Sequence, residues 1–170
     1  MTETNRLSIE ALGGLLRERK ISARELTDEA LTNMRLGAYR QVESLTSRRM
    51  AATADEAFGK GRDLGPLQGI PISVKDLFGV QGFRTMAGSP NALPVQFEQP
   101  GPIIEALLKQ AVVIMGKTHT VEFAFGGIGT NPHWPTPTNP WDIQARRAPG
   151  GSTSGGGVSL CEGSSLLALG

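Results

Sequence analysis

Apolar positions recur at helical spacing in the first part of the chain. Residues 8–19 carry apolar side chains along one face, and the first of them, Ser8, is a candidate N-cap. A second segment opens at Ser22 with the sequence SARE, which has the form of a capping box. Residues 47–60 continue with alanines among charged residues. This pattern predicts three helices, which together form a helical N-terminal segment over residues 1–62.

The pattern changes in residues 63–170, where short apolar runs alternate with a helical stretch. Residues 70–74 are apolar and β-rich, and residues 112–115 form a second such run, closed by Gly116. Between them, residues 102–110 are expected to form a helix with four side chains directed inward, namely Ile103, Ile104, Leu107 and Leu108. Alternation of helices with apolar strands predicts an α/β fold with a largely buried sheet. This part would be the start of the α/β core.

Glycine is the unusual component of the composition. The chain has 22 glycines in 170 residues, where average usage is about 7%. Residues 126–151 are rich in glycine and proline and predict a long loop, and loops of that length are usually functional or disordered. Beyond them, small residues and the apolar run at 166–170 predict a helix leading to another strand. Because the sequence stops inside this run, we expect it to be a truncated part of a longer protein; the alternative is a terminal edge strand.

Charge and cysteine content exclude several classes of protein. There are 17 lysines and arginines against 16 aspartates and glutamates, a formal net charge of +1, which gives no electrostatic reason to expect binding of nucleic acid or of an anionic membrane. The chain begins without the apolar core of a secretory signal, and no apolar run approaches the roughly 20 residues that span a bilayer. The single cysteine, Cys161, excludes an intrachain disulfide and suits a reducing compartment. We therefore expect a cytoplasmic protein.

Motifs with recognisable order and spacing lie in the second part of the chain. Residues 65–76 read GPLQGIPISVKD, residues 116–118 read GKT, residues 122–124 read EFA, and residues 149–155 read PGGSTSG. Together these stretches resemble the amidase signature family of serine amidohydrolases. The resemblance runs from about Ser22 onward.

The resemblance implies a fold and a mechanism. The family fold is a mixed β-sheet core covered by helices on both sides, and its chemistry uses a Ser–Ser–Lys triad. By motif position the lysine is Lys75, and the middle serine, which follows a cis peptide bond, is Ser152. The nucleophilic serine would lie in a motif of the type GTDTGGS, about six residues past Gly170. Residues that would support the signature loop are Gly150, Gly151, Thr153 and Ser154.

Several positions depart from the family pattern. His119 stands where asparagine is usual, and Thr153 where serine is frequent. Ala111 replaces a common glycine and disfavours a helix stop with positive φ there. Trp134 and Pro135 occupy a region where a glycine is common, which affects the substrate rather than the reaction class. We take as the candidate substrate pocket Gly126, Gly127 and Trp134.

The proposed chemistry explains why a lysine would stand at position 75. Serine-dependent amide hydrolysis needs a base for the hydroxyl proton and an acid for the leaving amine. Lys75 can serve as both only if its pKa falls by several units from about 10.4, which burial among apolar groups can achieve. The preceding apolar strand supplies such surroundings. Asp76 should face away, because successive strand side chains point to opposite sides.

Other interpretations of the polar residues are weaker. Neither His119 nor His133 has cysteine or carboxylate neighbours at metal-ligand spacing, so we expect no metal and interpret His119 as a satisfied loop histidine. Cys161 is expected to be a packing thiol. Ser152 could also cap the following helix, and Ser154 is expected to be a structural hydrogen-bonding residue.

Two glycine-containing stretches invite comparison with phosphate-binding loops. The GKT sequence at residues 116–118 lacks the first glycine of a P-loop, since position 111 is alanine, and strand-like sequence precedes it, so we reject that interpretation. Residues 150–157 could cradle an anion at a helix start, although they lack the lysine that such loops use. This anion site is an alternative from a different class.

The sequence therefore predicts an amidase that hydrolyses a carboxylic or urea-type amide, acts on a small-molecule substrate and needs no cofactor. Without the nucleophile, the chain alone should be inactive. One alternative is the amidase component of a tRNA-dependent amidotransferase. Another is a non-catalytic fragment that assembles with a partner, and a homo-oligomer is also open.

Overall fold

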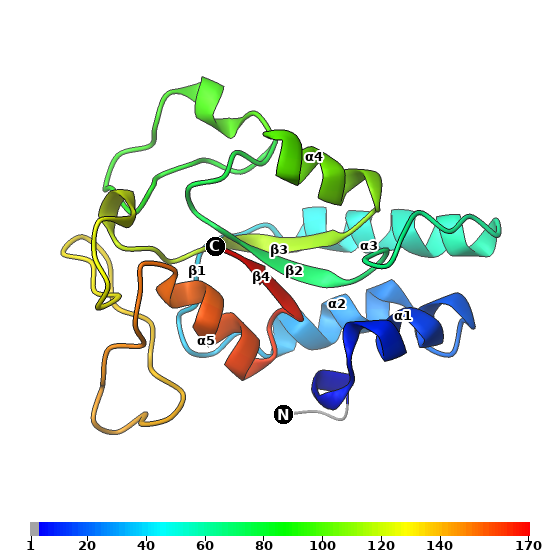
Figure 1. Ribbon diagram of the computed structural model, residues 1–170, viewed down its shortest axis with the longest axis horizontal. Helices are drawn as coiled ribbons and strands as arrows, with labels where there is room; N and C mark the ends of the chain where they lie inside the picture. The colour runs from blue at the N-terminus through cyan, green and yellow to red at the C-terminus, as the bar shows by residue number, and fades with distance from the viewer. Residues whose placement is uncertain (1–3) are drawn as a thin grey trace.

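A mixed four-stranded sheet forms the centre of the structure, a computed structural model that describes residues 4–170 (Figure 1). The strand order is β1-β3-β2-β4. β2 runs parallel to both β3 and β4, whereas β1 is antiparallel to β3. The strands are β1 (Tyr39–Val42), β2 (Pro71–Lys75), β3 (Val113–Thr118) and β4 (Leu167–Leu169). Residues 1–3, part of the segment in which we expect no secretory signal, lie outside the described residues.

Helices flank this sheet on both sides. α5 contacts β2, β3 and β4, and both α2 and α3 contact β3. In the view of Figure 1, α4 lies above the strands and α5 below them. The fold is thus α/β with a mixed sheet, as the sequence predicts. The helices are α1 (Ile9–Arg17), α2 (Ala23–Thr32), α3 (Ser44–Gly59), α4 (Pro102–Lys109) and α5 (Ser154–Glu162), with short 3₁₀ turns at Thr4–Arg6, Val95–Glu98 and Glu122–Ala124.

The predicted helix starts are confirmed by their capping hydrogen bonds. The Ser8 hydroxyl accepts a hydrogen bond from the Ala11 N–H at 3.1 Å. At the start of α2, the Ser22 hydroxyl accepts from the Glu25 N–H at 3.1 Å, and the Glu25 carboxylate accepts from the Ser22 N–H at 2.8 Å. Both halves of the capping box are therefore present, which satisfies N–H groups that the helix itself leaves without partners.

The two central strands lie in the core along their whole length. Every residue of β2 and β3 is buried. Burial on both faces explains why these strands read as continuous apolar runs and not as an alternating pattern. The same burial encloses the polar side chains that these strands carry, so their polar groups need partners inside the protein.

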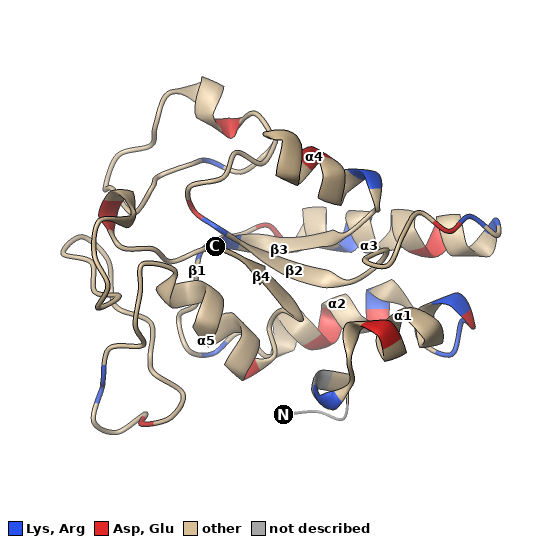
Figure 2. Cartoon of the chain, in the orientation of Figure 1, with Lys and Arg blue, Asp and Glu red and all other residues tan. Residues whose placement is uncertain are grey.

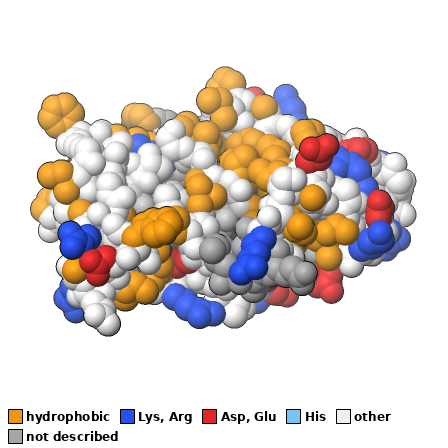
Figure 3. Space-filling model, turned by 60° about the horizontal axis from the view of Figure 1, so that its bottom comes forward, with side chains coloured by type: hydrophobic (Ala, Val, Ile, Leu, Met, Phe, Trp, Pro, Cys, Tyr) orange, Lys and Arg blue, Asp and Glu red, His pale blue; other side chains and the backbone are white. Residues whose placement is uncertain are grey.

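The described helices include none with the length and apolarity of a bilayer-spanning segment. Charged residues of both signs are spread over the helices and loops (Figure 2). On the face shown in Figure 3, hydrophobic side chains reach the surface between charged ones. The large hydrophobic residues that are most exposed are Leu45, Val95, Phe125, Ile128 and Trp141.

The structure corrects one prediction about the strands and adds a strand that was not predicted. β3 does not close at Gly116 but continues to Thr118. Gly116 lies inside the strand because β1 passes close to it: a Cβ there would come within 2.3 Å of the Gln41 carbonyl oxygen. β1 itself, with the mixed sequence YRQV, is absent from the prediction, since only its pairing with a strand far along the chain makes it a strand.

Three side-chain or backbone predictions were also wrong. Ile103 is 56% exposed, because α4 turns only Ile104 fully into the core. Ala111 adopts a φ of 53° directly after α4, held by a hydrogen bond from its N–H to the Leu108 carbonyl at 2.9 Å. Cys161 is an exposed free thiol on α5 and not a packing residue.

Candidate active site

The side chains of Lys75 and Ser152 meet beside the end of β2. Lys75 is the last residue of that strand and is only 6% exposed. Its Nζ donates a hydrogen bond to the Ser152 Oγ at 2.7 Å. Ser152 follows a cis peptide bond from Gly151. The structure thus brings together the two side chains that the sequence analysis assigns to the reaction.

The surroundings of Lys75 favour its neutral form. Burial lowers the pKa of Lys75 below its ordinary value of 10.5. Among the described residues, no carboxylate lies within ion-pair distance of its amine. The adjacent Asp76 instead forms an ion pair with Lys117. This agrees with the prediction that Asp76 faces away from Lys75. An amine that is buried, hydrogen-bonded to a hydroxyl and not paired with a carboxylate is suited to act as a base.

Asp76 forms a buried ion pair with Lys117, which the sequence analysis missed. The Lys117 ammonium, on β3, is fully buried and lies 3.0 Å from the Asp76 Oδ1. Burial raises the pKa of Asp76, and the ammonium of Lys117 opposes that rise. Burial likewise lowers the pKa of Lys117, against the effect of the carboxylate. The available signal was a lysine inside an apolar strand, which must find a buried partner.

The backbone around Ser152 is held by the segment that follows β3. The Ser152 carbonyl accepts hydrogen bonds from the Val121 N–H at 3.1 Å and from the Thr120 hydroxyl at 3.0 Å. The Gly151 N–H donates to the Gly127 carbonyl at 2.9 Å. These bonds position the hydroxyl of Ser152 without involving it, so the hydroxyl can bind Lys75.

Gly129 also supports the signature loop, and the sequence analysis did not single it out. Its φ is +90°, and a Cβ there would lie 2.0 Å from the Gly150 carbonyl oxygen. Only glycine fits both the backbone conformation and this close approach. The other predicted loop residues follow: Thr153 precedes α5 and Ser154 is its first residue. Since the N-cap of α5 is Thr153, Ser152 does not take the capping role.

His119 lies directly behind this loop. It is 1% exposed, and its Nδ1 is 2.8 Å from the Ser154 Oγ. Its Nε2 is buried and has no hydrogen-bond partner among the described residues, so the prediction of a satisfied histidine holds for one ring nitrogen only. Burial, helped by the Arg40 charge, lowers the pKa of His119 to about 4. The imidazole is therefore neutral near pH 7.

Comparison with known proteins agrees with this geometry. A family model described as Amidase matches residues 24–170. The chain belongs to the amidase family. Among curated proteins it is 48% identical over 169 residues to the 2-amino-5-chloromuconic acid deaminase of Comamonas testosteroni, a match that covers 96% of the chain and 37% of that protein. It is also 35% identical over 177 residues to a glutamyl-tRNA(Gln) amidotransferase subunit of Chloroflexus aurantiacus, covering 100% of the chain and 36% of that protein.

The fold matches solved structures of the family. A crystal structure of an amidase superposes with a TM-score of 0.85 at 28% identity, covering 96% of this chain and 38% of that one. The chain thus spans little more than a third of the length of the relatives that it matches.

The three candidate substrate-pocket residues of this amidase-family chain contact different parts of the structure. Gly127 binds the signature loop through its carbonyl, and Gly126 lies beside Val121. Trp134 is fixed in place: its Nε1 donates to the Ser89 carbonyl at 3.3 Å, and the Arg40 guanidinium lies 3.4 Å from the centre of its ring. Trp134 therefore anchors the long loop through contacts on its ring and its Nε1.

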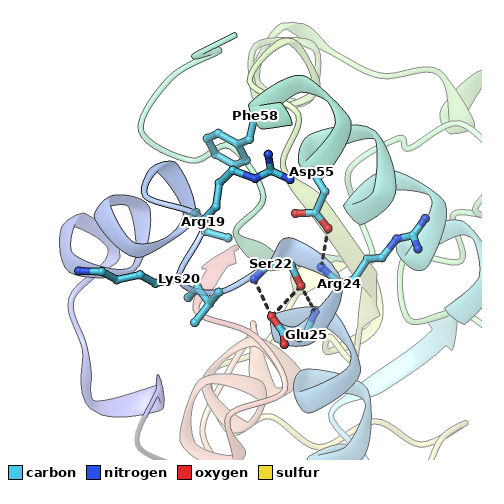
Figure 4. A pocket seen from close by; sticks show the side chains of 9 residues that line it. Arg19, Lys20, Ser22, Arg24, Glu25, Asp55 and Phe58 are labelled. Carbon is cyan, nitrogen blue, oxygen red and sulfur yellow. Dashed lines mark hydrogen bonds between the residues drawn. The ribbon is translucent and has the colours of Figure 1, made fainter. Parts of the chain in front are cut away.

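A surface pocket beside α2 lies in the N-terminal helical segment, apart from these residues (Figure 4). Three of its labelled side chains, Ser22, Glu25 and Asp55, form hydrogen bonds at the start of the helix. The Asp55 carboxylate accepts from the Ala23 N–H at 2.7 Å and from the Arg24 N–H at 3.2 Å. Since these groups are occupied in capping α2, the pocket has a structural explanation. The described residues also contain no cluster of three or more histidine, cysteine or acidic side chains that could hold a metal ion.

Proposed function

We propose that this chain is the N-terminal part of a serine amidohydrolase that cleaves an amide-type C–N bond. Lys75 is the base, Ser152 relays the proton, and the nucleophilic serine lies in the sequence that follows Gly170. One observation carries the proposal: a 6% exposed lysine amine donates to the Ser152 hydroxyl at 2.7 Å and has no carboxylate partner within residues 4–170. A depressed lysine pKa beside a hydroxyl is what a Ser–Lys variant of triad chemistry requires.

Proton movement in this scheme is balanced. The nucleophilic serine attacks the carbonyl carbon and gives its proton to the Ser152 oxygen, while the Ser152 proton passes to neutral Lys75. Lys75, now an ammonium, returns a proton through Ser152 to the leaving amine as the C–N bond breaks. Water then hydrolyses the acyl-enzyme by the same relay in reverse.

The end of β4 supports the position assigned to the nucleophile. Leu169 pairs with Val74 in the parallel register, one residue before Lys75. A Cβ at Gly170 would lie 2.4 Å from the Thr153 side-chain methyl, so Gly170 is in contact with the residue after Ser152. Sequence continuing from Gly170 would begin beside the Lys75–Ser152 pair. We expect it to carry the serine in a motif of the type GTDTGGS.

For the substrate, we favour a small primary amide, since hydrolysis of its carbonyl C–N bond through an acyl-enzyme releases ammonia. The support is the 48% identity to a protein named as a deaminase of 2-amino-5-chloromuconic acid. The alternative is the role of an amidotransferase component, supported by identities of 34–35% to several glutamyl-tRNA(Gln) amidotransferase subunits. A component of a glutamine-dependent amidotransferase would release ammonia from glutamine only with its partner subunits, whereas a small-molecule enzyme would act alone.

The test uses the full-length protein encoded by the open reading frame that contains this chain. Ammonia release is measured on small amides, on amino-substituted unsaturated acids and on glutamine, for the wild type, Lys75→Ala and the control Lys60→Ala. Lys60 is exposed and pairs with Glu56 on the preceding turn of helix. We expect Lys75→Ala to abolish release and Lys60→Ala to leave it unchanged. Hydroxylamine should divert an amide's acyl group to the hydroxamate, because it intercepts the acyl-enzyme.

Near-normal turnover in Lys75→Ala would contradict the assignment of the base. Hydrolysis without hydroxamate formation would argue against the acyl-enzyme. Activity confined to glutamine in the presence of partner subunits would select the amidotransferase alternative.

A further inference from the structure

Lys117 is a fully buried cation that the proposed reaction does not use. Its ammonium donates to the Asp76 carboxylate at 3.0 Å and to the Thr85 hydroxyl at 3.2 Å, and it lies 3.5 Å from the Arg84 carbonyl. Burying a charged lysine costs free energy through desolvation, unless each N–H of the ammonium has a hydrogen-bond acceptor. Here the three groups around it occupy the three ammonium protons.

Asp76 is fixed at the point where the two central strands, β2 and β3, end side by side. Its N–H donates to the Thr118 carbonyl at 3.2 Å, and its carboxylate accepts from the Met86 N–H at 3.2 Å. The carboxylate therefore joins the end of β2 to the loop that returns over it, and the residue immediately before it is Lys75. Any change in the charge or position of Asp76 acts next to the base.

We propose that Lys117 is a positioning residue for Lys75: by pairing with Asp76 it holds the end of β2 and keeps the neighbouring carboxylate from stabilising the protonated base. This inference rests on the proposed function of Lys75. It goes beyond it by assigning a role to an ion pair that does not touch the reacting atoms.

The charges around the ends of β2 and β3 come from four elements. Asp76 follows β2, and Lys117 lies on β3. Arg40, on β1, lies within electrostatic reach of Asp76, and Glu98, at the end of the 3₁₀ turn before α4, acts on Lys117. Ser152 faces Lys75 from the signature loop and is uncharged. Because the paired charges are opposite, we expect their effects on Lys75 to offset each other in the intact pair, which agrees with burial being the cause of the lowered Lys75 pKa. Loss of either partner leaves one buried charge uncompensated, with opposite signs in the two cases.

The experiment measures kcat/KM against pH for the full-length protein and for Lys117→Met, Asp76→Asn and the double variant. Lys117→Met leaves the carboxylate, which favours protonated Lys75, so the acidic limb should move to higher pH by about one unit. Asp76→Asn leaves the ammonium, so the limb should move to lower pH. The double variant has no net change in charge and keeps an acceptor for the Met86 N–H, so its limb should return to the wild-type position.

Thermal melts establish that each variant is folded before its profile is compared. If Lys117→Met does not fold, the Asp76→Asn and double variants decide, because a shift to lower pH in the former and its reversal in the latter are still required. Acidic limbs that coincide in all folded variants would overturn the inference. Failure of the proposed function looks different: Lys75→Ala would then keep its activity, whatever the pH profiles of the other variants.

Discussion

The Lys75 amine and the Ser152 hydroxyl are 2.7 Å apart, although the residues are separated by 77 positions in the sequence. The strand fixes one partner and the hydrogen-bonded signature loop fixes the other. Because the Ser152 backbone is held through its carbonyl, the side chain contributes little to the loop's own structure. Chemistry and stability at this position can therefore be separated by mutation.

Replacing Ser152 by alanine should lower amide hydrolysis by orders of magnitude without unfolding the protein. The relay hydroxyl is lost, while the carbonyl contacts with Thr120 and Val121 remain. Kinetics and a thermal melt on the full-length protein check both halves of this prediction. Ser154→Ala is the matched comparison, since Ser154 binds His119 rather than Lys75, and its loss of activity should be much smaller. Equal losses in the two variants would remove the special role of Ser152.

Gly129→Ala should destabilise the protein by roughly 1–3 kcal/mol and reduce its activity. The new methyl group would meet the Gly150 carbonyl at a distance no real contact allows, and the φ of +90° disfavours alanine. Gly127→Ala is the control, because a Cβ there has nothing within 4 Å. Urea unfolding of both variants measures the difference. A Gly129→Ala protein as stable as Gly127→Ala would show that the signature loop does not depend on this contact.

Stability should fall as the pH is lowered from about 6.5 to about 4, partly because of His119. Its folded pKa of about 4 lies below the ordinary value of 6.5. Between these values the unfolded chain binds a proton that the folded chain does not, so the free energy of unfolding decreases toward low pH, by up to about 3 kcal/mol from this group. His119→Asn should remove that part of the slope, and replacement of the exposed histidine, His133→Asn, should retain it. Identical pH slopes in the two variants would contradict the burial argument.

Trp134 should contribute mainly to stability. Trp134→Phe keeps an aromatic face for Arg40 but loses the hydrogen bond to Ser89, whereas Trp134→Leu loses both. We expect urea unfolding to show a loss of about 1 kcal/mol for phenylalanine and about 2 kcal/mol for leucine. If instead KM rises in both variants with little change in stability, Trp134 belongs to the substrate pocket as the sequence suggests.

Local signals predicted most of the fold, and long-range contacts account for what they missed. The capping residues Ser8 and Ser22 mark helix starts because their bonds are made within three residues. Strand β1 and the extension of β3 beyond Gly116 depend on pairing between segments far apart, which no local pattern reveals. Motif positions pointed to Lys75 and Ser152. The partner of Lys117, by contrast, is set by how two strands align, so its role became visible only in three dimensions.

The pKa of the Lys75 amine in the folded, full-length protein tests the central claim most directly. It can be followed by NMR titration of ¹⁵N-labelled lysine side chains, with the Lys75 signal assigned by its absence in Lys75→Arg. The account predicts a titration clearly below 10.5, since burial lowers the pKa of this amine. A Lys75 amine that titrates at 10.5 or above would be protonated at neutral pH and would contradict its role as the base.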